Sequence, residues 1–109
     1  MLDKVSQTVL TQNIVYPPGK PQISSSIVTL APGGSIPWHR HDAPLYGYIL
    51  SGTLTVHYEN GPVNTYPTGT ALLEAIGTYH MGENLGKVPV RILIVNFGSD
   101  QVQNTVLRP

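Results

Sequence analysis

Two histidines separated by one residue, His39 and His41, are the side chains of this sequence best suited to hold a metal ion. Side chains alternate between the two faces of a β-strand, so these imidazoles point the same way, roughly 7 Å apart along the strand. They can then converge on one ion in a pocket, while Trp38 and Arg40 point to the opposite face. Two imidazoles make only part of a site, so a further ligand must come from elsewhere in the chain.

The elements that must position this pair are short strands separated by turns. A Pro-Gly-Gly turn at 32–34 precedes the histidine segment, and Asn60-Gly61 is a strong signal for a two-residue hairpin. Apolar runs and period-two alternation predict strands at 26–30, 36–41, 45–50, 53–58, 63–66, 70–73, 79–81 and 90–97. No stretch has helical periodicity. Many short strands at close spacing predict an all-β sandwich or barrel.

The two ends of the sequence have weaker patterns. Segment 5–15 mixes β-branched and polar residues, which predicts one or two edge strands. Segment 99–109 is polar with isolated aliphatic residues, which fits an edge strand, an arm swapped into a partner or a loose tail.

Composition excludes several classes of function. A chain of 109 residues suffices for one core, so we predict a single domain over 1–109. Charged residues make up 11% and the formal net charge is zero, which excludes a basic surface for nucleic acid or an anionic membrane. The absence of cysteine excludes disulfides and thiolate metal sites. Residues 1–10 lack the apolar run of a signal peptide or membrane helix, so we expect a cytoplasmic protein.

Two spaced motifs resemble those of the cupins, a superfamily of small β-barrel proteins. The first family motif is a glycine, five residues, His-x-His, three or four residues, a glutamate, six residues and a glycine. The second is a glycine, five residues, proline, one residue, glycine, two residues, histidine, three residues and asparagine. The matching positions here are Gly33, His39, His41 and Gly52 in 33–52, and Gly69, Gly77, His80 and Asn84 in 69–84, with Ala75 in place of proline. The resemblance implies a double-stranded β-helix, or jelly-roll, barrel with 1–22 and 99–109 as edge strands or arms.

The first motif departs from the family pattern at its glutamate. Counting three residues after His41 places Leu45 there and counting four places Tyr46, and the spacing back from Gly52 favours Leu45. The resemblance then implies a site of three imidazoles, as also occurs among cupin dioxygenases. The expected metal ligands are His39, His41 and His80. Such a set holds one divalent ion, Mn, Fe, Co, Ni, Cu or Zn, and leaves other coordination positions open.

The missing carboxylate has an electrostatic consequence for the ligand. Three neutral imidazoles leave the +2 charge of the ion uncompensated, and inside an apolar barrel that charge favours an anion. We therefore expect a carboxylate, an enolate or a diketone-type chelate as the small-molecule ligand. Leu45 makes the pocket wall apolar at this place. The other pocket candidates, Tyr46 and Tyr48, are better suited to packing with bonded hydroxyls than to acid–base catalysis.

The remaining polar and aromatic residues near the motifs have structural interpretations. His57 lies opposite the apolar face of its strand and is expected to point outward. Asp42 and Glu74 could each support an imidazole N–H, but a surface position is the simpler expectation. We expect Asn84 to fix a turn, Trp38 to pack at the rim or an interface, and Tyr79 to face outward.

These observations support two kinds of function. The first is an enzyme, a mononuclear metal-dependent oxygenase of the dioxygenase kind, with Lewis-acid isomerase or lyase chemistry as its redox-inert variant. The second is a non-catalytic barrel that binds a small ligand. The apolar strand 90–97 fits either a barrel core or an interface, and the resemblance implies a homodimer.

Overall fold

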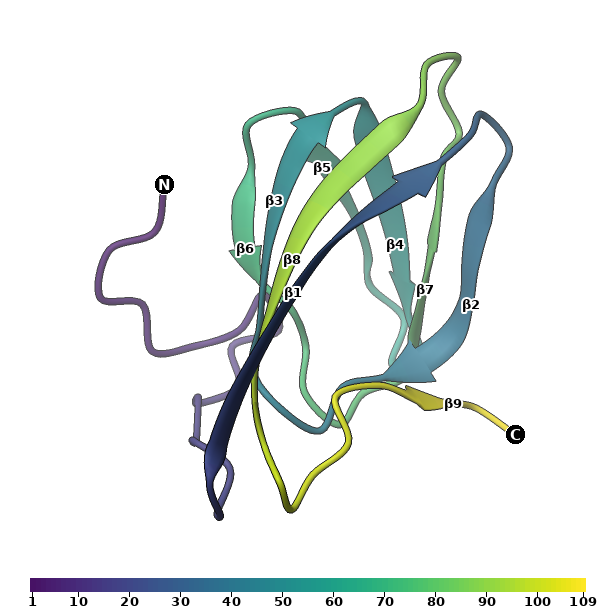
Figure 1. The fold of residues 1–109 in the computed structure, drawn as a ribbon. Helices are drawn as coiled ribbons and strands as arrows, with labels where there is room; N and C mark the ends of the chain where they lie inside the picture. The colour runs from purple at the N-terminus through teal and green to yellow at the C-terminus, as the bar shows by residue number, and fades with distance from the viewer.

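Two antiparallel sheets face each other in a computed structural model that describes residues 1–109 (Figure 1). The sheets have the strand orders β1-β8-β3-β6 and β5-β4-β7-β2-β9. The strands are β1 (Pro21–Leu30), β2 (Ser35–Arg40), β3 (Leu45–Ser51), β4 (Thr53–Tyr58), β5 (Val63–Pro67), β6 (Ala71–Leu73), β7 (His80–Glu83), β8 (Val90–Ser99) and β9 (Val106–Leu107). The predicted all-β architecture is confirmed, and no helix that could span a membrane is present.

The strand segments predicted from the pattern are all present, and the main difference is that β1 begins earlier, at Pro21. The predicted hairpin at Asn60-Gly61 joins β4 to β5, but its loop has three residues, 59–61, rather than two, because Tyr58 N donates to Pro62 O. Gly61, with a φ of 112°, is the residue of this loop with a positive φ. This agreement arises because turn glycines and period-two alternation are local signals.

The predicted edge strands at 5–15 are wrong. This segment forms only an isolated bridge between Gln7 and Asn13, because the chain reverses at Thr11, whose φ is 62°. The reversal is held by the side chain of Gln12, which donates to Ile76 O at 2.7 Å and accepts from Ile76 N at 3.0 Å. The N-terminal segment is therefore an arm that lies against the β6 end of the barrel (Figure 1).

The core lies between the two sheets and is made of inward-facing aliphatic residues. Along β8, Val90 and Ile92 are buried in the core, whereas Leu93 and Val95 alternate to the outer face and are half-buried. The apolar strand predicted at 90–97 thus contributes one of its faces to the barrel core. The largest fully buried aliphatic side chains come from three strands: Ile49, Val56 and Val90.

The turn between β3 and β4 is packed tightly against the start of β8. Gly52 occupies this turn with a φ of 76°, a conformation that glycine adopts without steric cost. A Cβ atom at Gly52 would lie 2.6 Å from the carbonyl oxygen of Pro89 and 3.0 Å from the Cα of Val90. The position therefore excludes any side chain.

Strand β9 makes the C-terminal segment an edge strand of the same chain, one of the alternatives left open for 99–109. It pairs with β2 beside His39 and Arg40. The guanidinium of Arg108 lies 4.5 Å from the centre of the Trp38 ring, a cation–π contact that holds the segment from outside. As Figure 1 shows, this strand crosses the end of the barrel where β2 ends.

Candidate metal centre

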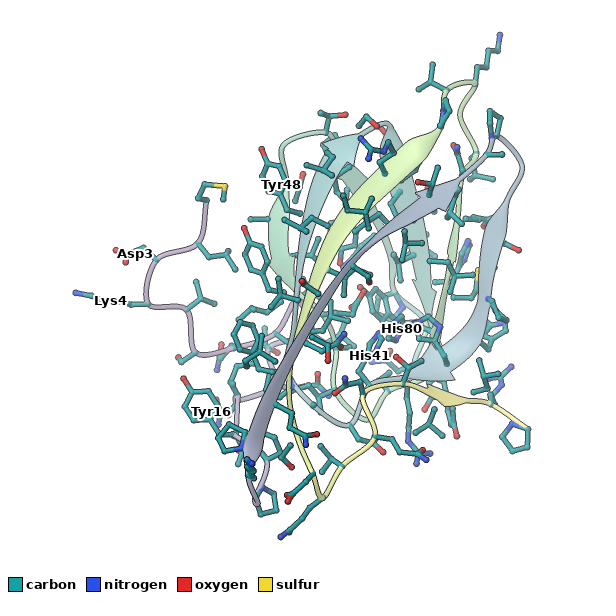
Figure 2. The ribbon with its side chains drawn as sticks, in the orientation of Figure 1. Asp3, Lys4, Tyr16, His41, Tyr48 and His80 are labelled. Atoms are coloured by element: carbon teal, nitrogen blue, oxygen red, sulfur yellow. The ribbon has the colours of Figure 1, made fainter.

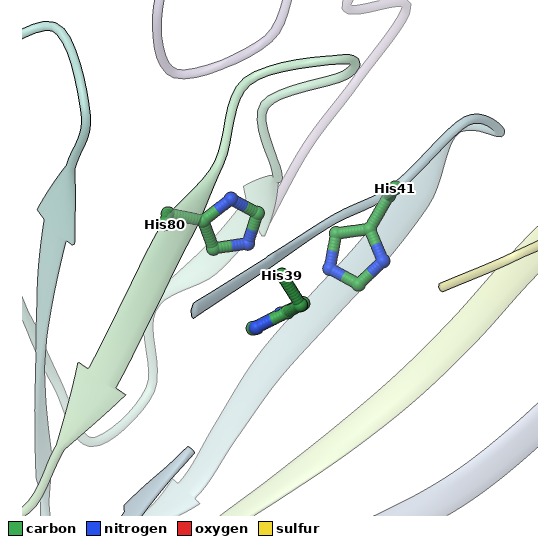
Figure 3. A group of neighbouring side chains, drawn as sticks. All are labelled: His39, His41 and His80. Atoms are coloured by element: carbon green, nitrogen blue, oxygen red, sulfur yellow. The ribbon is translucent and has the colours of Figure 1, made fainter. Parts of the chain in front are cut away.

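The three histidines predicted as metal ligands come together between the sheets. His39 lies near the end of β2, His41 follows that strand, and His80 begins β7 directly opposite His39 in the register. The ring centres are 4.4 Å apart for His39–His80, 4.9 Å for His39–His41 and 5.1 Å for His41–His80. One ligand nitrogen from each ring lies within 4.8 Å of the other two, and all three residues are buried (Figure 3).

Each imidazole is held by a hydrogen bond from Nδ1 to a backbone carbonyl. The acceptors are Pro37 O for His39 at 2.6 Å, Thr78 O for His80 at 2.9 Å and Asn104 O for His41 at 3.1 Å. A carbonyl only accepts, so Nδ1 carries the proton and Nε2 keeps its lone pair. None of the three Nε2 atoms has a hydrogen-bond partner in the chain. Three fixed, unpartnered nitrogen donors fit a divalent first-row ion.

The electrostatics keep these imidazoles neutral. Burial lowers the pKa of His39 and His80, and burial together with the charges of the other two imidazoles lowers the pKa of His41 to about 4. Because metal ligands must be deprotonated, the set is ready to bind an ion at neutral pH without displacing protons from the rings.

We predict that the metal-free protein loses stability on mild acidification. His41 has a folded-state pKa of about 4 against an ordinary value of 6.5, so below pH 6.5 the unfolded chain binds a proton that the folded chain refuses. The free energy of unfolding should then be about 2 kcal/mol lower at pH 5 than at pH 7 from His41 alone. Urea denaturation of chelator-treated protein measures this change, and His41→Gln should remove the His41 share of about 2 kcal/mol. A pH dependence that is the same in His41→Gln and the wild type would contradict the prediction.

The imidazoles open into an apolar cavity of about 250 Å³ between the sheets. Its polar side chains are the three histidines, Glu74 and Thr105, and neither lysine nor arginine lines it. Thr105 lies 3.4 Å from His41 Nδ1, so the polar groups gather at the imidazoles. The apolar lining consists mainly of Val28, Ile36, Leu45, Ile49, Leu54, Val56, Leu72, Ile92, Ile94 and Leu107.

Glu74 is a member of this site, and its predicted surface position is wrong. It is only 6% exposed. Its Oε1 accepts hydrogen bonds from Tyr58 O–H and Ala75 N–H, both at 2.7 Å, while Oε2 has no hydrogen-bond partner and lies 3.8 Å from His80 Nε2. Burial raises the pKa of the carboxyl, and the two donors oppose that rise. An acidic residue inside the apolar run 71–76 was the signal that could have identified it.

A chain of buried hydrogen bonds fixes the Glu74 carboxylate. Because Tyr58 donates its only hydroxyl proton to Glu74, the 2.7 Å bond between Tyr58 and Tyr66 must be donated by Tyr66. Asn64 Nδ2 in turn donates to the Tyr66 hydroxyl at 3.0 Å. Burial raises the pKa of both tyrosines, so they stay neutral hydrogen-bond donors. Alternation along 53–58 puts Tyr58 on the inward face of its strand, but no sequence pattern marks this role.

Of the three pocket candidates on β3, only Leu45 lines the cavity. Leu45, Gly47 and Ile49 face inward, so alternation turns Tyr46 and Tyr48 to the outer face of the sheet. Figure 2 shows Tyr48 on the outside, with His41 and His80 between the sheets. We therefore remove both tyrosines from the pocket. Leu45 therefore points into the cavity that the histidines line, whereas Tyr46 points away from it.

The other residues singled out in the sequence lie outside the cavity. His57 is half-exposed and hydrogen-bonds Glu83 on the outer face of its sheet. Asp42 pairs with Arg40 at 3.0 Å, and Arg40 also donates to the Tyr79 hydroxyl at 2.8 Å. The buried amide of Asn84 donates to Leu30 O and Val88 O and accepts from Gly86 N, which fixes the turn after β7 as predicted.

Two sheets that enclose a buried three-histidine cluster define a small β-barrel of the double-stranded β-helix class. The family model for the cupin domain matches residues 26–96, and the chain belongs to this family. The resemblance found in the two sequence motifs is thereby confirmed.

Solved structures share this fold, and one curated protein is similar in sequence. A double-stranded β-helix protein of Klebsiella pneumoniae matches with a TM-score of 0.68 and 20% identity, over 88% of this chain and 90% of that one. An oxalate oxidase matches with a TM-score of 0.65 and 24% identity, over 78% of this chain and 45% of that one. A putative mannose-1-phosphate guanylyltransferase of Vibrio cholerae is 35% identical over 83 residues, 74% of this chain and 17% of that protein. The chain thus spans less than a fifth of the length of that relative.

Proposed function

We propose that this protein is a mononuclear metal-dependent oxygenase of the dioxygenase kind, acting on a small anionic organic compound. The observation that carries the proposal is the set of three unpartnered Nε2 atoms that open into an apolar cavity. A divalent first-row ion held by His39, His41 and His80 would supply Lewis acidity and, for a redox-active ion, electron transfer to O₂.

The shape and lining of the cavity define the class of substrate. A volume of about 250 Å³ is below the roughly 300–1,000 Å³ typical of ligand pockets, so the substrate has few atoms. All polar groups lie at the imidazole end, and the remaining walls are aliphatic. These walls would bind a short apolar tail, exclude water and orient an anionic head, such as a carboxylate, enolate or diketone, toward the histidines.

Oxygen consumption tests the proposal. The purified protein is loaded in turn with Fe(II), Mn(II), Ni(II) and Cu(II) and supplied with short-chain carboxylates and diketones. We expect O₂ uptake that requires both metal and substrate. Turnover of the same panel without O₂ would overturn the oxygenase in favour of a Lewis-acid lyase or isomerase, and metal-dependent ligand binding without turnover would favour a non-catalytic barrel.

A variant with a filled cavity shows whether turnover takes place in the cavity or on metal bound loosely elsewhere. A Cβ atom at Gly47 would make ordinary contacts, the nearest at 3.6 Å to Leu72 Cγ, so the rest of a leucine side chain would extend into the cavity. Gly47→Leu should keep the metal, because no ligand is changed, and should lose most of the turnover. Retained turnover in this variant would place the reaction outside the cavity.

We also propose that the protein forms a homodimer through the outer face of β1 and β8. Ile23, Ile27 and Phe97 are exposed large apolar residues on this face, and β1 has an unpaired edge. Light scattering during gel filtration should give twice the chain mass of 11.8 kDa. A monomeric mass at micromolar concentration would contradict it. A cytoplasmic location stays a prediction.

A further inference from the structure

The Glu74 carboxylate is buried in the cavity without a positive counter-charge. No lysine or arginine lines the cavity, and the neighbouring imidazoles are each held through Nδ1 by a backbone carbonyl rather than by Glu74. An ionised carboxylate is strongly disfavoured in an apolar interior unless a cation or several donors compensate it. Tyr58 and Ala75 both donate to Oε1, so Oε2 is left without compensation. The site therefore lacks one positive charge beside Oε2.

The distance of Glu74 Oε2 from the nearest imidazole nitrogen is close to that expected for two ligands of one metal ion. Metal–ligand bonds of roughly 2.0–2.2 Å place two neighbouring donor atoms about 3.0–3.4 Å apart around one ion. Glu74 Oε2 lies 3.8 Å from His80 Nε2, closer than the 4.8 Å that spans the three histidine nitrogens. The Oε2–Nε2 distance therefore exceeds the separation expected for two donors on one ion by less than about 1 Å. The hydrogen bonds to Oε1 hold the carboxylate with the correct oxygen turned toward the imidazoles.

We propose that Glu74 is the fourth protein ligand of the metal site. Its carboxylate, which lies in the second motif, would replace the glutamate of the first motif, where this chain has Leu45. The proposal rests on the three-histidine metal site of the proposed function. A carboxylate ligand also changes the net charge of the metal-bound site. Three imidazoles alone would leave this charge at +2, and Glu74 reduces it to +1. A monoanion then neutralises the site completely, which narrows the substrate to compounds with one anionic head.

Metal affinity provides the test, with a matched pair of substitutions. Zn(II) and Co(II) are titrated into metal-free protein against a chromophoric chelator. Glu74→Gln should weaken binding at least about 10-fold and change the visible spectrum of the Co(II) form, because an oxygen ligand is lost. Glu83→Gln makes the same change on β7, on the outer face beside His57. It should leave the Zn(II) affinity within about 2-fold of the wild type and the Co(II) spectrum unchanged.

Two further measurements keep the proposal falsifiable if Glu74→Gln does not fold. Tyr58→Phe removes one donor to Oε1 and leaves the carboxylate, so it should weaken Zn(II) binding by a smaller factor. A crystal structure of the Zn(II)-loaded wild type should place Glu74 Oε2 at roughly 2.0–2.2 Å from the ion. A normal affinity in Glu74→Gln, or an oxygen more than about 4 Å from a bound ion, would overturn the proposal for Glu74 and leave the three-histidine site intact. A wild type that binds no ion would overturn both.

Discussion

Replacing His39 or His80 by alanine should reduce the bound metal from about one ion per chain to less than about a tenth. Each substitution removes one of three nitrogen donors that are already fixed by backbone carbonyls, Pro37 O and Thr78 O. Loss of a residue that only supports a ligand typically weakens a site roughly 10–100-fold, so loss of the ligand itself should exceed that range. Elemental analysis after dialysis against a weak chelator measures the content, and chelator competition measures the affinity.

His57 gives this experiment a control of the same residue type. It is the fourth histidine of the chain, and it lies outside the cavity, hydrogen-bonded to Glu83. His57→Ala should therefore retain the ion with unchanged affinity. The site assignment would be wrong if His39→Ala and His80→Ala kept a full complement of metal, or if all three alanine variants lost it equally.

Gly52→Ala should be the most destabilising single-methyl change in this barrel. The new Cβ would lie 2.6 Å from Pro89 O, a backbone atom that cannot move without displacing the start of β8. The left-handed conformation adds about 1–2 kcal/mol and the overlap about 1–3 kcal/mol, so we expect a loss of about 2–5 kcal/mol. Urea denaturation gives the loss directly, and the midpoint of thermal unfolding should fall by more than about 10 °C.

Gly69→Ala separates the two contributions. Gly69 also has a positive φ, 87°, but a Cβ there would meet nothing within 4 Å. This variant should therefore lose only the conformational part, roughly 1–2 kcal/mol. Equal losses in the two variants would show that the close approach to Pro89 does not contribute to stability.

The barrel and its three histidines could be predicted because both depend on local patterns. Turn glycines and alternating residues mark the strands, and the spacing of two motifs marks the ligands. The inward and outward faces of β3 were harder, because Leu45, Tyr46, Tyr48 and Ile49 are all apolar or aromatic. A strand of this kind has no period-two signal, so the tyrosines were assigned to the wrong side.

The burial of Glu74 escaped prediction, and the C-terminal segment could not be decided among its alternatives, for a different reason. Glu74 lies between β6 and β7, outside any regular element, and its burial depends on Tyr58 in another strand. Strand β9 pairs with β2 over only two residues, more than 60 positions away in the chain. Neither arrangement is favoured by a local preference, and each exists only once the barrel has closed.

Because Asn104 O, in the segment that leads into β9, is the acceptor that orients His41, metal binding and docking of that segment are thermodynamically linked. Thr105 and Leu107 from the same segment also form part of the cavity wall. This linkage is reciprocal: if docking of the segment raises the metal affinity by a given factor, a bound ion raises the docking equilibrium constant by the same factor. A partner that captures residues 104–108 would therefore weaken metal binding without contacting the ion, and a bound ion would protect this end of the chain from proteolysis.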